Sequence, residues 1–203
     1  MPGEPTNLGA NAWRSQLPSL NGRVVALREP ATQDADAVVG LLSLADATRF
    51  GLDEPVSEIA VHELIERFAR ERAGGLAFTY LIVLSASRST VGLMQVRQLD
   101  AAFETAEWEC TVDPPSRGTG VFVEAARLVG SFVFGALGTH RLEARVLLQN
   151  GRAHGALRKL GAVQEGVLRR SMRRDDEYFD QVLWSLLKED WSDHWVSTEP
   201  RVH

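Results

Sequence analysis

The sequence Asp113-Pro114-Pro115-Ser116-Arg117-Gly118-Thr119-Gly120 joins an apolar-polar run, residues 105–112, to a long stretch of helical periodicity that begins at Val121. Glycine has no Cβ, so the backbone at Gly118 and Gly120 can turn tightly and come close to a ligand. The first N–H groups of the following helix are expected to be unpaired, at the positive end of the helix dipole. The sequence therefore predicts an anion site, made mostly of backbone, from Arg117 to Phe122.

The form of this motif excludes two common phosphate sites. It has no Gly-Lys-Ser/Thr, which the P-loop of a nucleoside-triphosphate site requires, and Val123 stands where a dinucleotide fingerprint has its third glycine. Taken alone, the residues leave two interpretations open. One is a plain loop that enters a helix, and the other is a site for a different phosphate-bearing ligand.

Composition restricts the class of protein. The chain has 203 residues, 44% of them hydrophobic and 24% charged, which is typical of a globular domain. No apolar run approaches the roughly 20 residues that span a bilayer. The first residues lack the basic and apolar regions of a secretion signal, and Cys110 is the single cysteine, so we expect a cytoplasmic protein. A net charge of −5 argues against nucleic acid as a bulk electrostatic partner.

Strands and helices alternate on both sides of the glycine turn. The apolar periodicities predict strands over residues 23–28, 77–84, 91–99, 105–112, 141–148, 163–174 and 177–187. They predict helices that start near residue 34, run from 57 to about 72, run from 121 to a stop at 138, and end before 161. We expect residues 1–19 to form an arm anchored by Trp13 and Leu17, residues 20–191 to form one domain, and residues 192–203 to form a tail.

The ordered set of motifs resembles the GNAT N-acetyltransferases, and within them the RimJ and RimL type that acetylates the N-termini of ribosomal proteins. The resemblance extends from about Leu20 to Trp191. It rests on Ala106-Glu107 before the turn, the turn itself, Asn150 after the next strand, and Leu160-Gly161. It implies an α/β (α+β) fold with a mixed, mostly antiparallel sheet of about seven strands flanked by about four helices.

The resemblance also implies a ligand, acetyl-CoA as co-substrate, and no metal. The coenzyme would lie in a V-shaped splay between the strand that ends at Val112 and the strand over residues 141–148, and Asn150 would bond its pantetheine arm. Phe122 departs from the glycine or alanine usual in the family at that place. The pyrophosphate would be bound by the N–H groups of Arg117, Gly118, Thr119, Gly120, Val121 and Phe122.

Transfer to an amine needs a base, because a protonated amine has no lone pair. Glu107 and Glu109 are two residues apart and therefore share one face of their strand. We expect Glu107, which matches the strand glutamate of the family, to be the base. Glu109 stands where the family often has a small residue, and it is the alternative. The structural interpretation, in which both are solvated or salt-bridged, stays open.

The leaving thiolate needs a group that protonates it. Family members often use a tyrosine or a serine of the short helix, where this chain has Arg158 and Ala153. His154 is therefore the second catalytic candidate, although a lone histidine is more often structural. Cys110 points to the face opposite Glu109, so we expect a small core residue rather than a nucleophile.

The expected acceptor is a primary amine, either a peptide or protein N-terminus or a small molecule, and the expected assembly is a monomer or a homodimer. Asp53 and Glu54, near the expected entrance, favour a cationic acceptor. Two further functions stay open: a non-catalytic protein of this fold that senses acyl-CoA, and a protein whose turn binds another phosphate. Four arginines of the last hairpin are candidates for a carboxylate or the outer phosphate of the coenzyme: Arg169, Arg170, Arg173 and Arg174.

Overall fold

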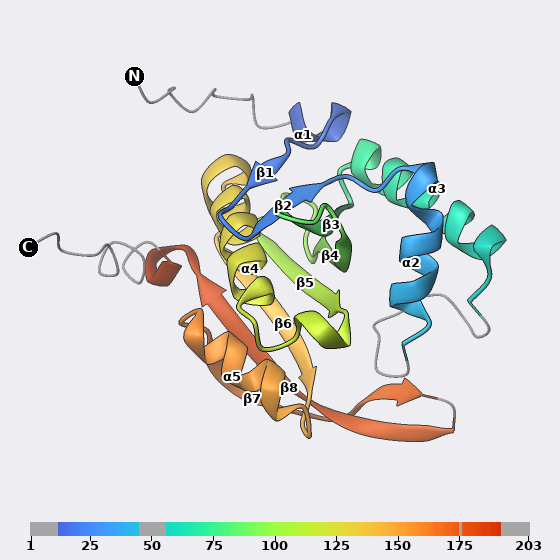
Figure 1. Cartoon of the computed structure of the whole chain (residues 1–203). Coiled ribbons are helices and arrows are strands. Elements are labelled where there is room, and N and C mark those ends of the chain that lie inside the picture. The colour runs from blue at the N-terminus through green and yellow to red at the C-terminus, as the bar shows by residue number, and fades with distance from the viewer. Residues whose placement is uncertain (1–11, 45–55, 175, 192–203) are drawn as a thin grey trace, which may run out of the picture.

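A mixed sheet of eight strands forms the centre of the computed structural model, which describes residues 12–44, 56–174 and 176–191 (Figure 1). The strands lie in the order β1-β2-β3-β4-β5-β6-β8-β7, and every neighbouring pair is antiparallel except β5 and β6. Their bounds are β1 Leu20–Asn21, β2 Val25–Arg28, β3 Ala77–Leu84, β4 Thr90–Gln98, β5 Thr105–Val112, β6 Arg141–Leu147, β7 Val163–Arg174 and β8 Glu177–Leu187.

The predicted fold class, mixed and mostly antiparallel, is confirmed. Strands β3, β5, β7 and β8 have the bounds that the sequence predicts, and β6 ends one residue earlier. The sheet has one strand more than the seven expected. The additional strand is β1, which was not predicted because its two residues are too few to leave a periodic signal.

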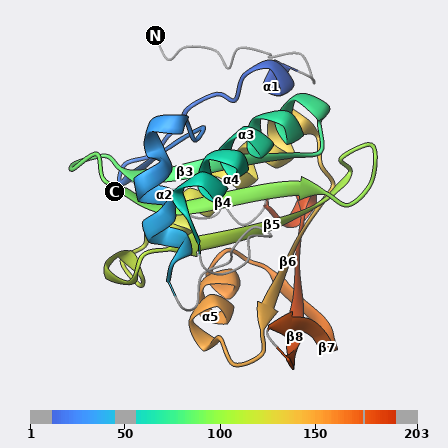
Figure 2. The ribbon, with the colours of Figure 1, turned by 90° about the vertical axis from the view of Figure 1, so that its right-hand side faces the viewer.

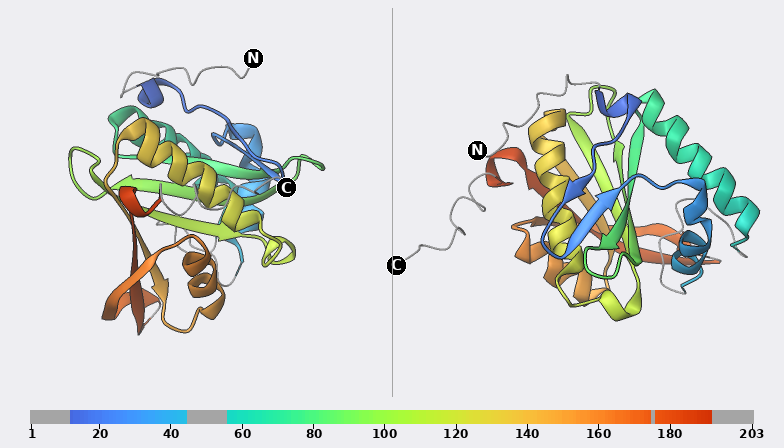
Figure 3. Two further views of the ribbon diagram at one scale, coloured as in Figure 1. Left: turned by 90° about the vertical axis from the view of Figure 1, so that its left-hand side faces the viewer. Right: turned by 45° about the horizontal axis from the view of Figure 1, so that its top comes forward.

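Helices cover both faces of the sheet (Figures 1 and 3). On one face lie α2 Ala35–Leu42 and α3 Glu58–Gly74. On the other lie α4 Val121–Phe132 and α5 Gly151–Lys159. These four are the expected helices, and the short α1 Ala12–Ser15 is additional. Ser57, where the sequence predicts this helix to begin, caps α3, since its hydroxyl accepts from the N–H of Ala60 at 3.1 Å.

Two apolar cores lie on the two faces of the sheet. The smaller core joins α2 and α3 to β3 and β4, and Leu93 of β4 belongs to it. The larger core joins α1, α4 and α5 to the opposite face, where Trp13 and Phe132 pack edge-on to Phe78 with ring centroids 5.5 Å apart. Trp13 and Leu17 are buried, which confirms the predicted anchor. Each fully buried side chain of this size contributes about 1.5–3 kcal/mol to folding.

The helix after the glycine turn ends where the sequence predicts. Beyond α4 the chain makes a wider π-helical turn over Val133–Leu137 and stops at Gly138, whose φ of 78° is left-handed. Trp191, from the end of the described chain, packs its ring on Gly130 of α4. None of the helices in residues 12–44, 56–174 and 176–191 is long and apolar enough to cross a bilayer.

Candidate active site

Strands β5 and β6 separate after their first three residues. They pair in parallel only from Thr105 and Arg141 to Glu107 and Glu143. Beyond that point β5 stays with β4, β6 stays with β8, and Figure 2 shows β6 running away from β5. The predicted V-shaped splay is therefore present, and the glycine turn follows the end of its β5 arm.

Side chains fix the shape of the turn. Asp113 Oδ1 accepts from the N–H of Ser116 at 3.0 Å and stabilises a 3₁₀ turn over Pro114–Ser116. Arg117 Nε donates to the carbonyl of Val112 at 2.8 Å, and Thr119 Oγ1 donates to the carbonyl of Ser116 at 2.7 Å. Gly118 and Gly120 have φ values of 81° and 93°, a backbone region that favours glycine.

The start of α4 presents free backbone donors. Its first backbone bond runs from the N–H of Glu124 to the carbonyl of Gly120, at 3.0 Å. In the part of the chain that the structure describes, the N–H groups of Val121, Phe122 and Val123 have no backbone partner. The ring of Phe122 packs toward Trp108, with centroids 6.3 Å apart, so its bulk faces the sheet. These donors lie at the positive end of the helix dipole. Their contact with a coenzyme stays a prediction.

Glu124 connects this helix start to the beginning of β2. Its carboxylate accepts from the N–H groups of Arg23, Val24 and Val25 at 3.0, 2.7 and 2.8 Å. Sequence reasoning gave Glu124 no role of its own. The sequence does show an acidic residue in the first turn of a helix, where negative charge is favourable. It does not show the bonding partners of Glu124, because they lie about 100 residues away in the chain.

Asn150 lies after β6, on the other arm of the splay. Its Oδ1 accepts from the N–H of Ala153 at 3.1 Å and caps α5. The side-chain amide is exposed and its NH₂ group is not used by this cap. The predicted bond from Asn150 to the pantetheine arm stays a prediction.

Glu107 is buried and held by two arginines. Its Oε2 accepts from Arg97 of β4, and its Oε1 accepts from Arg145 of β6 at 2.5 Å. Sequence reasoning missed both arginines. The register places Arg97 directly opposite Glu107, while Arg145 lies two residues beyond Glu143, the partner of Glu107 on β6. Both carboxylate oxygens are therefore engaged before any substrate is present.

The charged network continues along β6. Arg145 also contacts Glu143 at 3.4 Å, and Arg141 bonds Glu143 at 2.8 Å. Arg141 donates through two nitrogens to Glu165, at 2.7 and 2.5 Å, and lowers the pKa of that carboxyl to about 2. The ion pairs thus run from β4 to β7 across the edge where the splay begins.

Glu109 has a different environment from Glu107. It is half-buried on β5 opposite Gln95, on the face that α2 and α3 cover. Among residues 12–44, 56–174 and 176–191, no hydrogen bond or ion pair involves its side chain. Burial raises the pKa of Glu109 to about 7, and the attraction of Arg97 offsets only part of this effect.

Both ring nitrogens of His154 are engaged in the core. Trp184 Nε1 donates to His154 Nδ1 at 3.0 Å, so Nε2 carries the proton and contacts the carbonyl of Leu148 at 3.1 Å. Arg158, at the expected tyrosine position, lies over the Trp184 ring at 5.3 Å. The catalytic role of His154 stays a prediction, and it would require His154 to give up the bond to Leu148.

Other residues singled out by the sequence lie apart from the splay or outside the described chain. Cys110 packs against the larger core, where burial raises its thiol pKa well above the usual range, so the prediction of a core residue is confirmed. Asp53 and Glu54 lie outside the described residues. The four arginines of the last hairpin, Arg169, Arg170, Arg173 and Arg174, lie on the edge strand β7.

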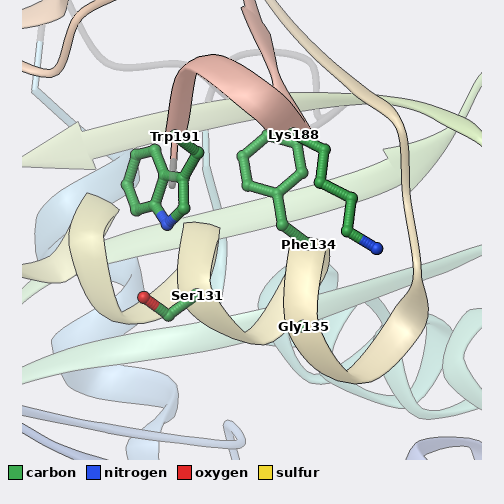
Figure 4. A pocket seen from close by; sticks show the side chains of 5 residues that line it. All are labelled: Ser131, Phe134, Gly135, Lys188 and Trp191. Carbon is green, nitrogen blue, oxygen red and sulfur yellow. The ribbon is translucent and has the colours of Figure 1, made fainter. Parts of the chain in front are cut away.

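Two further observations delimit the site. In the described parts of the chain, no group of three or more His, Cys, Asp or Glu side chains is arranged to hold a metal ion. A shallow hollow of about 240 Å³ is lined by Ser131, Phe134, Gly135, Lys188 and Trp191 (Figure 4). It lies at the far end of α4, about 20 Å along the helix axis from the glycine turn.

Known proteins share this fold and this sequence pattern. The chain matches the family model of the acetyltransferase (GNAT) domain over residues 25–163. It is 27% identical over 173 residues to the uncharacterized N-acetyltransferase YoaA of Bacillus subtilis (strain 168), which covers 85% of this chain and 98% of that protein.

Two solved structures show the same fold. RimJ of Mycobacterium smegmatis, in complex with CoA-disulfide, has a TM-score of 0.75 and 23% identity over 89% of this chain and 92% of that one. The ribosomal-protein-S5-alanine acetyltransferase of Vibrio fischeri has a TM-score of 0.74 and 18% identity over 86% and 98%. The chain therefore belongs to the GNAT family of acetyltransferases, whose co-substrate is acetyl-CoA, and it is an acyltransferase.

Proposed function

We propose that this protein transfers the acetyl group of acetyl-CoA to a primary amine, by direct attack of the amine in a ternary complex. The observation that carries the proposal is the separation of β5 and β6 beyond Glu107, followed at once by a glycine turn and an open helix start. Two diverging strands that end at an anion-binding helix start suit a long ligand that carries phosphate.

The pyrophosphate would accept hydrogen bonds from N–H groups between Arg117 and Phe122, and the pantetheine arm would lie in the splay beside Asn150. Backbone alternation supports this placement. Because the N–H of Asp113 donates to Val91 of β4, the backbone groups of Trp108, Cys110 and Val112 are directed to the opposite edge of β5. β6 has left that edge, so the groups there, apart from the carbonyl of Val112 that accepts from Arg117, would be available to the amides of the arm.

The chemistry then needs three things from the protein. A backbone N–H near Val112 would stabilise the oxyanion that forms at the thioester carbonyl. A carboxylate of β5, Glu107 or Glu109, would take a proton from the acceptor ammonium. The two bound substrates would be held so that nitrogen faces carbonyl carbon, which replaces a bimolecular step by an effectively unimolecular one.

The acceptor that we propose is the N-terminus of a peptide or protein, or a small amine. The sequence resemblance to the RimJ and RimL type favours a peptide N-terminus. The acceptor would approach on the face of α2 and α3, where the side chains of Glu107 and Glu109 lie.

A mass-spectrometric screen tests this function. The purified protein is incubated with acetyl-CoA and a panel of amines that includes peptides beginning with serine, alanine or threonine, and spermidine. We expect a mass increase of one acetyl group on at least one acceptor, and release of free thiol only when that acceptor is present. Binding of coenzyme without acetylation anywhere in the panel would contradict transfer, and absence of binding would contradict the site.

A further inference from the structure

The two carboxylates of β5 share a face, but they are not equivalent. Glu107 lies at the last position where β5 and β6 pair, and both of its oxygens accept from arginines of neighbouring strands. Glu109 lies two residues beyond, where β6 no longer accompanies β5. Of the two, Glu109 is therefore the carboxylate beside the opened part of the splay.

A proton acceptor also needs an available lone pair. Before Glu107 could take a proton, it would have to give up a hydrogen bond to Arg97 or Arg145. The carboxylate of Glu109 has no such partner within the described residues. Its side chain is shielded without being fully enclosed.

We infer that Glu109 takes the proton from the acceptor ammonium, and that Glu107 is a positioning residue that ties Arg97 and Arg145 together where the strands separate. This inference rests on the proposed function and names the base within it. It departs from the expectation from sequence that Glu107 is the base.

The charges around Glu109 agree with this role. Arg97 of β4 is bound to Glu107, and Arg67 and Glu71 of α3 lie 3.6 Å from each other. Glu71 also accepts from Gln95, the residue opposite Glu109. The one charged side chain of α2, Asp36, is exposed, and Arg145 of β6 is shared between Glu107 and Glu143. Desolvation thus dominates, and a pKa of about 7 suits a base that works near neutral pH.

The proton balance is complete without a further reactant. The ammonium loses one proton to Glu109, and the nitrogen lone pair forms a C–N bond to the thioester carbonyl carbon. Collapse of the tetrahedral intermediate breaks the C–S bond and expels the thiolate. The nitrogen gives a second proton to the thiolate, which leaves as free coenzyme A, and keeps the third in the amide. Glu109 then returns its proton to solvent.

The test is the pH dependence of kcat and kcat/KM between pH 5.5 and 9.5. It compares wild type, Glu109→Gln and Glu107→Gln, with the best acceptor of the peptide and spermidine panel. Glu66→Gln serves as control, because Glu66 is exposed on α3 and pairs only loosely with Arg70. Calorimetric titration with coenzyme A and circular dichroism verify that each variant is folded and binds the donor.

We expect Glu109→Gln to lower kcat at pH 7 by about 100-fold. The ascending limb of the pH–rate profile near pH 7 should disappear in this variant, so that the profile shows only the titration of the acceptor amine. Coenzyme affinity should not change. Glu107→Gln should keep the limb near pH 7, even where its kcat falls. If the ascending limb of the pH–rate profile near pH 7 persists in Glu109→Gln and disappears in Glu107→Gln, the inference is overturned, while the proposed function stands. Absence of turnover by wild type across the panel would overturn the proposed function, and the inference with it.

Discussion

Arg145 of β6 reaches across the separating strands to Glu107 of β5, and its Nη1 lies 2.5 Å from Glu107 Oε1. The pair spans the two arms of the splay beside the last position at which their backbones are bonded, Glu107 with Glu143. Arg97 holds the other oxygen of the same carboxylate from β4. Three strands are therefore joined through one buried side chain.

Glu107→Gln should reduce the free energy of unfolding by about 1–3 kcal/mol, because a neutral amide cannot balance two guanidinium groups. The cost is smaller than for a fully enclosed pair, since Arg97 is 53% exposed and Arg145 keeps Glu143. Urea denaturation at pH 7 measures it. Glu66→Gln, from an exposed pair, should stay within about 0.5 kcal/mol of wild type. Equal stability of the two variants would show that the pair does not brace the sheet.

Glu109→Gln should stabilise the folded protein at high pH. The pKa of Glu109 lies at about 7 in the folded state against 4.5 in the unfolded chain, so the folded state holds the proton more tightly. Stability from this group is complete below pH 4.5 and is lost as the pH rises through 7. We expect the variant to exceed wild type by about 1–2 kcal/mol at pH 8 and to match it at pH 4.5. Urea denaturation at both pH values is the measurement, and a constant difference would contradict the shifted pKa.

Features formed by residues close together in the sequence were predictable, whereas side-chain contacts that depend on the register of paired strands were missed. The turn and β5 were predictable because glycine and the alternation of β5 act over a few residues. The arginines that hold Glu107 were not, since Arg97 meets it only through the pairing of β4 and β5, and Arg145 only where β6 diverges. Residue type alone made Glu107 and Glu109 look alike, and the structure separates them by partners and burial.

His154→Phe should destabilise the fold, because it leaves the N–H of Trp184 and the carbonyl of Leu148 without their partner. The expected loss is about 1–3 kcal/mol, since an unsatisfied buried polar group costs its desolvation. Thermal or urea unfolding measures this loss. Unchanged stability together with a collapse of kcat would instead favour the catalytic prediction for His154.

Gly130→Ala tests the packing of Trp191 on α4. A Cβ at Gly130 would lie 2.6 Å from two atoms of the Trp191 ring, so the indole must move. Helix propensity favours alanine by about 1 kcal/mol, whereas overpacking costs about 1–3 kcal/mol, and we expect net destabilisation. Gly135→Ala, one turn along the same helical segment with no atom within 4 Å, should be at least as stable as wild type. Equal stability of the two variants would mean that Trp191 is not held there.

Gly118→Ala and Gly120→Ala test the anion site. No atom lies within 4 Å of a Cβ at either position, so the effect must come from the backbone, whose φ values of 81° and 93° are unfavourable for alanine. Each variant should lose about 1 kcal/mol of stability.

Relaxation of the turn would also redirect the N–H groups that follow it, and we expect the affinity for coenzyme A to fall about tenfold, or 1.4 kcal/mol. Gly40→Ala is the matched control, because Gly40 is an exposed residue of α2 with an ordinary φ and no atom within 4 Å of an added Cβ. It should leave coenzyme binding unchanged. Calorimetric titration with coenzyme A measures the affinity of each variant. A wild-type affinity in both turn variants would place the phosphate elsewhere, because Gly118 and Gly120 are the positions in the turn whose strained backbone shapes these donors.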